Sequence, residues 1–173
     1  MGQYCCKSKK FKPKLEEPAK PPIEVDDFIY RCKFESGFKD YIEANFETKN
    51  LEKYLMVEQG GIFSLDLVIK VFMASFVWKN IIFDHMQKPL LQERINMLKK
   101  KEEIRYKIII NDLEDLEEKV FQSCFIRVKA ELKIVEENFQ RSMSLHMVTE
   151  ENRKKIQKIE DTAFNYFMNV KNN

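Results

Sequence analysis

The stretch from residue 65 to residue 86 constrains the fold most, because it is apolar on almost every side of a helix. Ser64 stands directly before it and is a residue type that caps helix N-termini well. Neither glycine nor proline interrupts the stretch. Its large apolar side chains are Leu67, Val68, Val71, Phe72, Phe76, Trp78, Ile81, Ile82 and Phe83. A helix that is apolar all round must be buried. The sequence therefore predicts a central helix from Leu65 to about Met86, wrapped by the rest of the chain.

The rest of the chain can supply helices far more readily than strands. The whole chain of 173 residues contains only 4 Gly and 5 Pro, too few to make the turns between many short strands. This length is enough for one core of ordinary size. The net charge of +2 lies close to balance, which argues against a basic nucleic-acid binder. We expect an all-α fold with a tail and linker at 1–24, a helical domain at 25–147 and a C-terminal helix at 148–173.

The segment that follows Pro89 is rich in Lys, Glu, Leu and Ile for almost sixty residues. Its apolar residues recur at helical spacing. They form three stripes: Leu91, Ile95 and Leu98; Ile109, Leu113, Leu116, Val120 and Cys124; and Val128, Leu132, Val135 and Phe139. This pattern predicts one long helix, or two or three helices packed together, with residues 110–112 (Ile-Asn-Asp) as the favoured interruption. Thr149, followed by two glutamates, predicts the start of a last helix carrying Ile156, Ile159, Phe164 and Phe167.

The first fourteen residues, MGQYCCKSKKFKPK, have the pattern of a lipid-anchoring signal. Removal of Met1 exposes Gly2, the residue that N-myristoylation requires. Cys5 and Cys6 follow as natural S-palmitoylation sites, although Cys6 occupies a position where Ser or Thr is usual in the myristoylation motif. The lysines that follow are Lys7, Lys9, Lys10, Lys12 and Lys14, with no acidic residue before Glu16.

The energetics favour these features as a set. A single myristoyl chain binds a bilayer with an association constant of only about 10⁴ per molar, so stable anchoring needs a second signal. Basic residues next to an anionic leaflet add roughly 1 kcal/mol each. We expect a disordered tail, acylated at Gly2 and at Cys5 and Cys6, that holds the chain at the cytoplasmic face of a membrane, with the plasma membrane as the expected one. The alternative is an unmodified basic tail.

Residues that could carry catalysis or hold a metal are scattered. His85 and His146 lie far apart in the chain and have no neighbouring Cys or His. Cys32 and Cys124 are isolated in apolar helical contexts. No phosphate-binding glycine loop or catalytic signature is present. We therefore expect neither a metal, nor a cofactor, nor a small-molecule substrate, and no enzymatic chemistry of the chain's own.

Residues 37–58, GFKDYIEANFETKNLEKYLMVE, carry a resemblance to a known family. This segment is similar to the middle of a regulator-of-G-protein-signalling (RGS) domain. The positions that match are Phe38, Tyr41, Ile42, Phe46, Asn50, Leu51 and Tyr54. Residues 113–121, LEDLEEKVF, are similar to the penultimate helix of that family. The resemblance implies an RGS-like helical bundle with a long C-terminal helical region.

The resemblance also implies a partner, a G-protein α subunit (Gα). Domains of this family provide no general base, but hold the GTPase switch loops in the conformation suited to phosphoryl transfer. Asn50 would lie nearest the attacking water, and Lys49, Leu51 and Tyr54 would line the same contact. From the residues alone, a polar residue in the first turn of a helix is the favoured interpretation of Asn50, because Asn is common near helix starts. We expect a regulator of Gα signalling that is at most a GTPase activator.

Two departures from the family leave other functions open. Lys49 replaces an acidic residue, and the second loop that should face Gα, around Trp78 to Asp84, is apolar and helix-like. The alternative is a membrane-tethered adaptor or scaffold whose helices beyond Leu90 recruit a partner protein by packing; an elongated shape or dimerisation would favour it. A third hypothesis is a long helix with a basic surface that coats a bilayer.

Overall fold

The computed structural model describes residues 43–45 and 61–172 of the chain. Residues 43–45 are helical, as the spacing of apolar residues around them predicts. The elements that follow are all helices: α4 (Leu65–Met86), α5 (Lys88–Lys100), α6 (Glu103–Glu131), α7 (Glu136–His146), α8 (Glu150–Gln157) and α9 (Ile159–Asn172). The expected all-α class is confirmed for these residues. In the described ranges, no helix combines the length and the apolar character needed to cross a bilayer.

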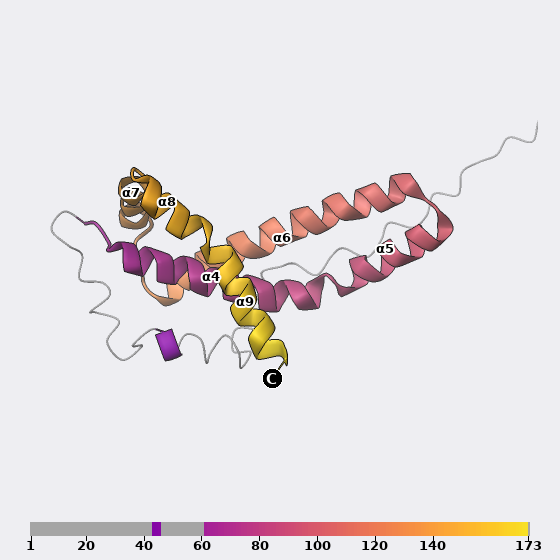
Figure 1. Cartoon of the computed structure of the whole chain (residues 1–173), viewed down its shortest axis with the longest axis horizontal. Coiled ribbons are helices and arrows are strands. Elements are labelled where there is room, and N and C mark those ends of the chain that lie inside the picture. The colour runs from indigo at the N-terminus through magenta and orange to yellow at the C-terminus, as the bar shows by residue number, and fades with distance from the viewer. Residues whose placement is uncertain (1–42, 46–60, 173) are drawn as a thin grey trace, which may run out of the picture.

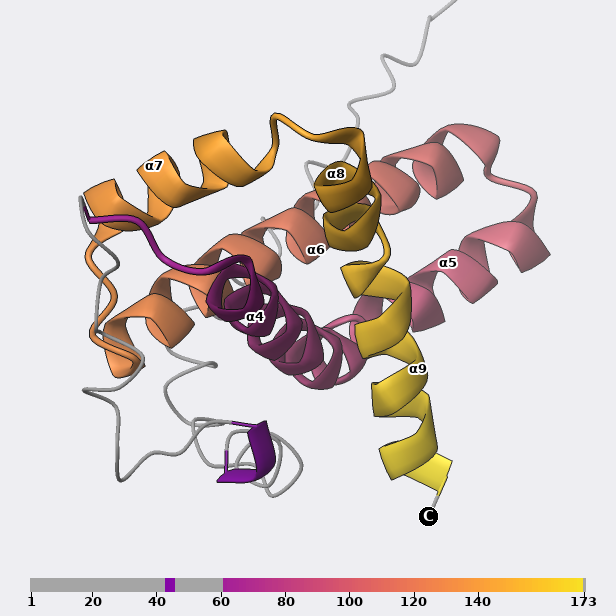
Figure 2. The same ribbon diagram turned by 60° about the vertical axis from the view of Figure 1, so that its left-hand side comes forward.

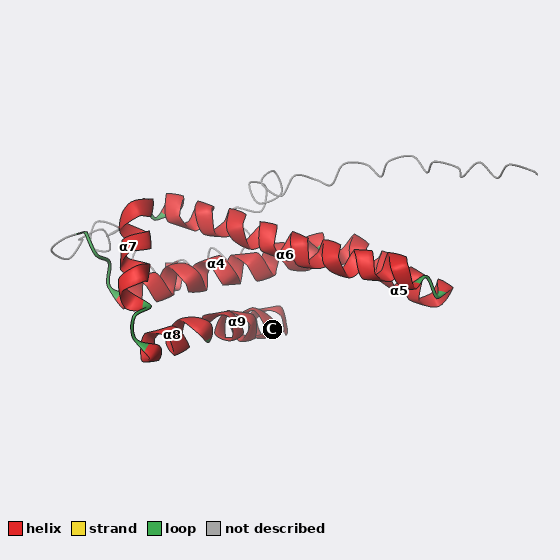
Figure 3. Ribbon diagram, turned by 90° about the horizontal axis from the view of Figure 1, so that it is seen from above, coloured by secondary structure: helices red, strands yellow, loops and turns green. Residues whose placement is uncertain are grey.

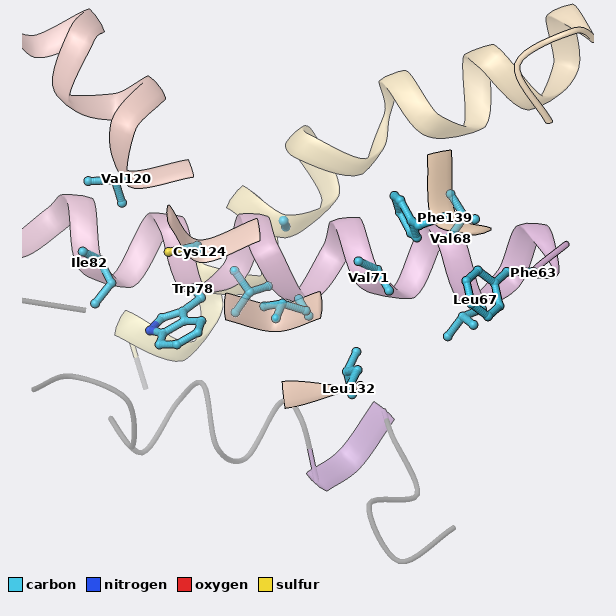
Figure 4. Packing of buried hydrophobic residues seen from close by; sticks show 14 residues of the cluster. Phe63, Leu67, Val68, Val71, Trp78, Ile82, Val120, Cys124, Leu132 and Phe139 are labelled. Atoms are coloured by element: carbon cyan, nitrogen blue, oxygen red, sulfur yellow. The ribbon is translucent and has the colours of Figure 1, made fainter. Parts of the chain in front are cut away.

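The central helix lies where the sequence places it. The Ser64 side chain caps α4 by accepting a hydrogen bond from the Leu67 N–H at 3.3 Å. Helices α6, α7 and α9 all pack against α4, which lies at the centre of the described structure (Figures 1 and 2). Figure 4 shows the side chains that meet along it. Besides those of α4, the core contains Phe63, Val120, Cys124, Val128, Leu132, Phe139 and Ala163. The predicted central, buried helix is therefore confirmed.

Side chains of α7 hold the segment before α4 by hydrogen bonds to the backbone of Phe63. The hydroxyl of Ser142 accepts a hydrogen bond from the buried Phe63 N–H at 2.7 Å. Nε2 of His146 lies 2.8 Å from the carbonyl oxygen of Phe63 and donates to it. Both polar groups of the Phe63 backbone are thus satisfied where the side chain enters the core, as buried backbone groups require. His146 is a structural residue in this arrangement.

The predicted interruption at residues 110–112 is wrong, because α6 runs through it without a break. Asn111 and Asp112 are exposed on the surface of α6, where their low helix propensity costs less than about 1 kcal/mol each. The helix ends instead after Glu131, and Leu132, Lys133 and Ile134 bond back to its last carbonyls. Packing of α6 along α4 and α5 outweighs the local signal.

The predicted last helix is in fact two helices that meet at Lys158. The Thr149 hydroxyl caps α8 as expected, accepting from the Asn152 N–H at 3.3 Å. No residue of α8 is buried, whereas Ile159 and Ala163 of α9 are. The chain changes direction at Lys158 so that α9 can lie against α4 (Figure 2). The C-terminal residues therefore share the core of the preceding helices.

Helices α5 and α6 form a hairpin that extends beyond this core. Helix α4 ends at Met86, Gln87 separates it from α5, and Pro89 stands in the first turn of α5, where proline is tolerated. Of the predicted apolar stripe in α6, Ile109, Val120 and Cys124 are buried, and Leu113 and Leu116 are half-buried. Ile95 and Leu98 of α5 and Val135 after α6 are exposed, against the expectation from their spacing. The hairpin projects away from α7, α8 and α9 (Figures 1 and 3).

Candidate functional site

The site residues predicted from the sequence all lie outside the residues that the structure describes. They are Gly2, Cys5, Cys6, Lys7, Lys9, Lys10, Lys12, Lys14, Lys49, Asn50, Leu51 and Tyr54. Their roles therefore stay predictions. The segment expected to match the second Gα-facing loop, Trp78 to Asp84, is described and lies within α4. Trp78 and Ile82 are buried in the core, so those two side chains cannot contact a partner.

Lys79 is a buried cation that joins three helices. It belongs to α4, and its Nζ donates to Glu117 Oε1 of α6 at 2.7 Å and to Glu160 Oε1 of α9 at 3.1 Å. A buried ammonium is costly unless it is paired and hydrogen-bonded. The two carboxylates meet this need while remaining partly exposed. Sequence reasoning missed this cluster, although a lysine among the large apolar residues of this stretch was a visible signal.

A cavity of about 420 Å³ lies beside Lys79, between α4, α6 and α9. A second ion pair closes its far side, where Lys171 Nζ donates to Asp84 Oδ1 at 2.6 Å. Asn80 lines the cavity with only 8% of its surface exposed, and its Nδ2 has no hydrogen-bond partner. Phe83, Phe164 and Phe167 supply apolar walls. The cavity offers one amide donor among paired charges, which suits binding of a small polar group.

Cys124 is the candidate nucleophile among the described residues, and its surroundings make it inert. The side chain is fully buried in α6 within the core. Burial raises the pKa of its thiol far above the ordinary value, and the nearby charge of Lys79 opposes this only in part. The thiolate is the reactive form of cysteine, and here it is strongly disfavoured. Cys124 is therefore a packing residue.

An aromatic groove opens between α4, α6 and α7, and its apolar residues are Phe72, Phe125, Ile126, Phe139 and Met143. Its volume is about 730 Å³. The ring of Phe72 lies 5.1 Å from that of Phe125 and 5.9 Å from that of Phe139, measured between centroids. Ile126 on its rim is exposed. Contiguous apolar surface of this kind marks an interaction site more often than a single exposed residue does.

A buried lysine borders the aromatic groove. Lys129 Nζ lies 4.0 Å from the centroid of the Phe125 ring, within range of a cation–π interaction. The same ammonium donates to the carboxylate of Glu136 at the start of α7. This hydrogen bond lowers the pKa of Glu136 below its usual value. The Lys129 ammonium is thus paired with a carboxylate and also lies beside the Phe125 ring.

The described part of the chain contains no cluster of three or more His, Cys, Asp or Glu residues arranged to hold a metal ion. Comparison with protein-family models, curated proteins and solved structures gives no match to this chain.

Proposed function

We propose that this chain is a lipid-anchored helical protein that binds a Gα subunit at the cytoplasmic face of a membrane and regulates its signalling. The inference of a Gα partner rests on the segment 37–58, whose apolar positions and Asn50 follow the RGS pattern. The inference of a membrane location rests on the acylation pattern of Gly2, Cys5 and Cys6. The two fit together, because a protein held at the inner leaflet meets membrane-bound partners at a raised effective concentration.

The placement of Trp78 to Asp84 inside α4 bears on how such a regulator would act. A GTPase activator of the RGS type needs several contacts that together hold the switch loops. The second of these contacts cannot be a loop at residues 78–84 here. We therefore assign recognition of Gα to four residues: Lys49, Asn50, Leu51 and Tyr54. Acceleration of GTP hydrolysis would need a further contact elsewhere on the chain.

Capture of Gα subunits tests the proposal. The full chain carrying Cys5→Ser and Cys6→Ser, which cannot be palmitoylated at these positions, is immobilised and offered a panel of Gα subunits in the GDP form and in the GDP–aluminium fluoride form. We expect selective capture of the fluoride form, which resembles the transition state. Asn50→Ala should weaken capture by about tenfold or more, the scale of an interface hot spot. Asn111→Ala, on the exposed face of α6, is the matched control.

Two results would contradict this account: capture of neither form by any subunit, or equal capture by the Asn50→Ala variant. Either result would favour the second candidate function, an acylated adaptor that recruits a partner by helix packing. The observation that favours it is the aromatic groove, because an apolar groove is the kind of surface on which an amphipathic helix lays its apolar face. The projecting α5–α6 hairpin gives the described body the elongated outline expected of such an adaptor (Figure 3).

A further inference from the structure

The end of the α5–α6 hairpin, residues 95–108, is the most exposed part of the described helices and is called the hairpin tip below. Helix α5 contains no buried residue, although it packs along α6. Figure 1 shows the tip at the end of the molecule that lies farthest from α7 and α8. The tip therefore adds little to the core.

The hairpin tip exposes large aliphatic side chains. Ile104, in the first turn of α6, is 80% exposed, and Leu98, near the end of α5, is 55% exposed. Ile95 and Ile108 are exposed as well. Ile95 and Leu98 lie one turn apart on α5, and Ile104 and Ile108 lie one turn apart on α6, so each helix presents an aliphatic stripe to solvent. Exposure of four such side chains at one extremity is unfavourable in water unless something covers them.

The same tip is strongly basic. It contains Lys99, Lys100, Lys101, Arg105 and Lys107 against two acids, Glu102 and Glu103, a balance of +3. Glu103 is already paired with Lys107 at 2.8 Å, and Arg105 is paired with Glu93 at 3.1 Å. In the described structure the three consecutive lysines have no ion-pair partner, and in the sequence they lie between the exposed Leu98 and Ile104. Positive charge therefore meets aliphatic surface at the tip.

The third of these lysines occupies a backbone position that favours glycine. Lys101 has a φ of 58° in the left-handed region, where it ends α5 by bonding back to Leu98 and Met97. Glycine is the usual residue at such a helix end because it has no Cβ to strain. The chain retains a lysine there despite this strain. Its charge adds to that of Lys99 and Lys100 at the tip, and the only other left-handed lysine among the described residues, Lys133, lies outside the tip.

We propose that the hairpin tip is a contact site for an anionic lipid bilayer, with its lysines on phosphate and carboxylate headgroups and with Leu98 and Ile104 inserted among the acyl chains. An interfacial helix segment of this type combines an aliphatic face with lysines at the headgroup level. A nucleic acid would instead favour exposed aromatic side chains on which bases stack, and the tip's aromatic residue, Tyr106, is half-buried. This inference goes beyond the proposed function and does not depend on acylation.

Vesicle binding tests the proposal on the full chain with its tail neutralised. The background chain carries Gly2→Ala, Cys5→Ser, Cys6→Ser and glutamine at the five tail lysines, so that the tail adds neither lipid nor charge. Sedimentation with phosphatidylserine–phosphatidylcholine vesicles at low salt is compared with phosphatidylcholine vesicles alone. We expect binding to the anionic vesicles, weakened roughly fivefold for each tip lysine changed to glutamine and on the order of a hundredfold for Lys99, Lys100 and Lys101 together.

Matched controls lie on the other side of the body. Changing Lys154 and Lys155 of α8, and Lys158 directly after it, to glutamine removes the same charge and should leave binding unchanged. Val148 is 72% exposed, so Val148→Ser is the control for Ile104→Ser. A tryptophan introduced by Ile104→Trp should be quenched by brominated lipids, and one introduced by Val148→Trp should not. Lys101→Gly should weaken binding roughly fivefold while the melting temperature stays the same or rises.

Three results would overturn the proposal. One is that the background chain fails to sediment with anionic vesicles. Another is that the control variant, with glutamine at positions 154, 155 and 158, loses as much vesicle binding as the variant with glutamine at positions 99, 100 and 101. Binding would then depend on the net charge of the chain alone. The third is that the tryptophan introduced at position 104 is not quenched, which would place the aliphatic residues outside the bilayer.

Discussion

A chain carrying Cys5→Ser and Cys6→Ser is expected to lose stable membrane residence and to keep only weak, salt-sensitive binding. A palmitoyl chain contributes about 0.8 kcal/mol per buried methylene, on the order of 10 kcal/mol in all, whereas myristate alone gives marginal binding. The remaining attraction comes from lysines, and salt screens it. The measurement is the residence time at the membrane by fluorescence recovery after photobleaching, with and without a high-salt wash of the isolated membranes.

Cys32→Ser is the matched control for that variant, because it makes the same chemical change away from the lysine-rich start. It should leave residence unchanged. Equally long residence of the Cys5→Ser and Cys6→Ser chain would show that palmitate is not the second signal. The lysines, or another part of the chain, would then have to supply it.

Replacing Trp78 by alanine is expected to lower the free energy of unfolding by about 3–5 kcal/mol. Trp78 is 1% exposed, and it lies in the middle of α4, on which α6 and α9 converge. Truncation removes its burial and leaves a cavity that the surrounding helices cannot fill. Because small domains are stable by only about 5–15 kcal/mol, the variant should lie close to the threshold of unfolding. Chemical denaturation followed by circular dichroism measures the change.

The control for the tryptophan is Ile104→Ala, since Ile104 is almost fully exposed. Surface substitutions usually change stability by no more than about 0.5 kcal/mol. A loss below about 1 kcal/mol for Trp78→Ala would contradict the placement of α4 at the centre of the core.

The features that the sequence predicted correctly are local ones. Ser64 and Thr149 begin helices because a hydroxyl two or three residues before a free backbone N–H is sufficient to cap it. The burial of α4 follows from the apolar character of its whole circumference. Each of these properties can be read within one stretch of sequence, so the start of α4 at Leu65 and that of α8 at Glu150 agree with prediction.

The features that it missed depend on residues far apart in the chain. The carboxylates that satisfy Lys79 lie 38 and 81 residues away from it, at Glu117 and Glu160. The breaks that delimit α6 occur at Lys101 and Lys133. Both are lysines in the left-handed conformation, where a glycine would have signalled the helix end in the sequence. Conversely, Asn111 and Asp112 look like a break but cost little on an exposed helix face. Tertiary packing decides all three cases.

The claim that this protein works as a lipid-anchored one is tested most directly by Gly2→Ala. Alanine at position 2 removes the N-terminal glycine that myristoylation requires, so that only the lysine contacts of the tail and of the hairpin tip can bring the cysteines to a bilayer, and these contacts are weak and salt-sensitive. The measurement is the fraction of full-length chain that sediments with cell membranes in high salt, which screens the lysine contacts of the tail and of the hairpin tip. We expect the unaltered chain in the membrane fraction and Gly2→Ala in the soluble fraction. Unchanged membrane retention of Gly2→Ala would contradict the claim.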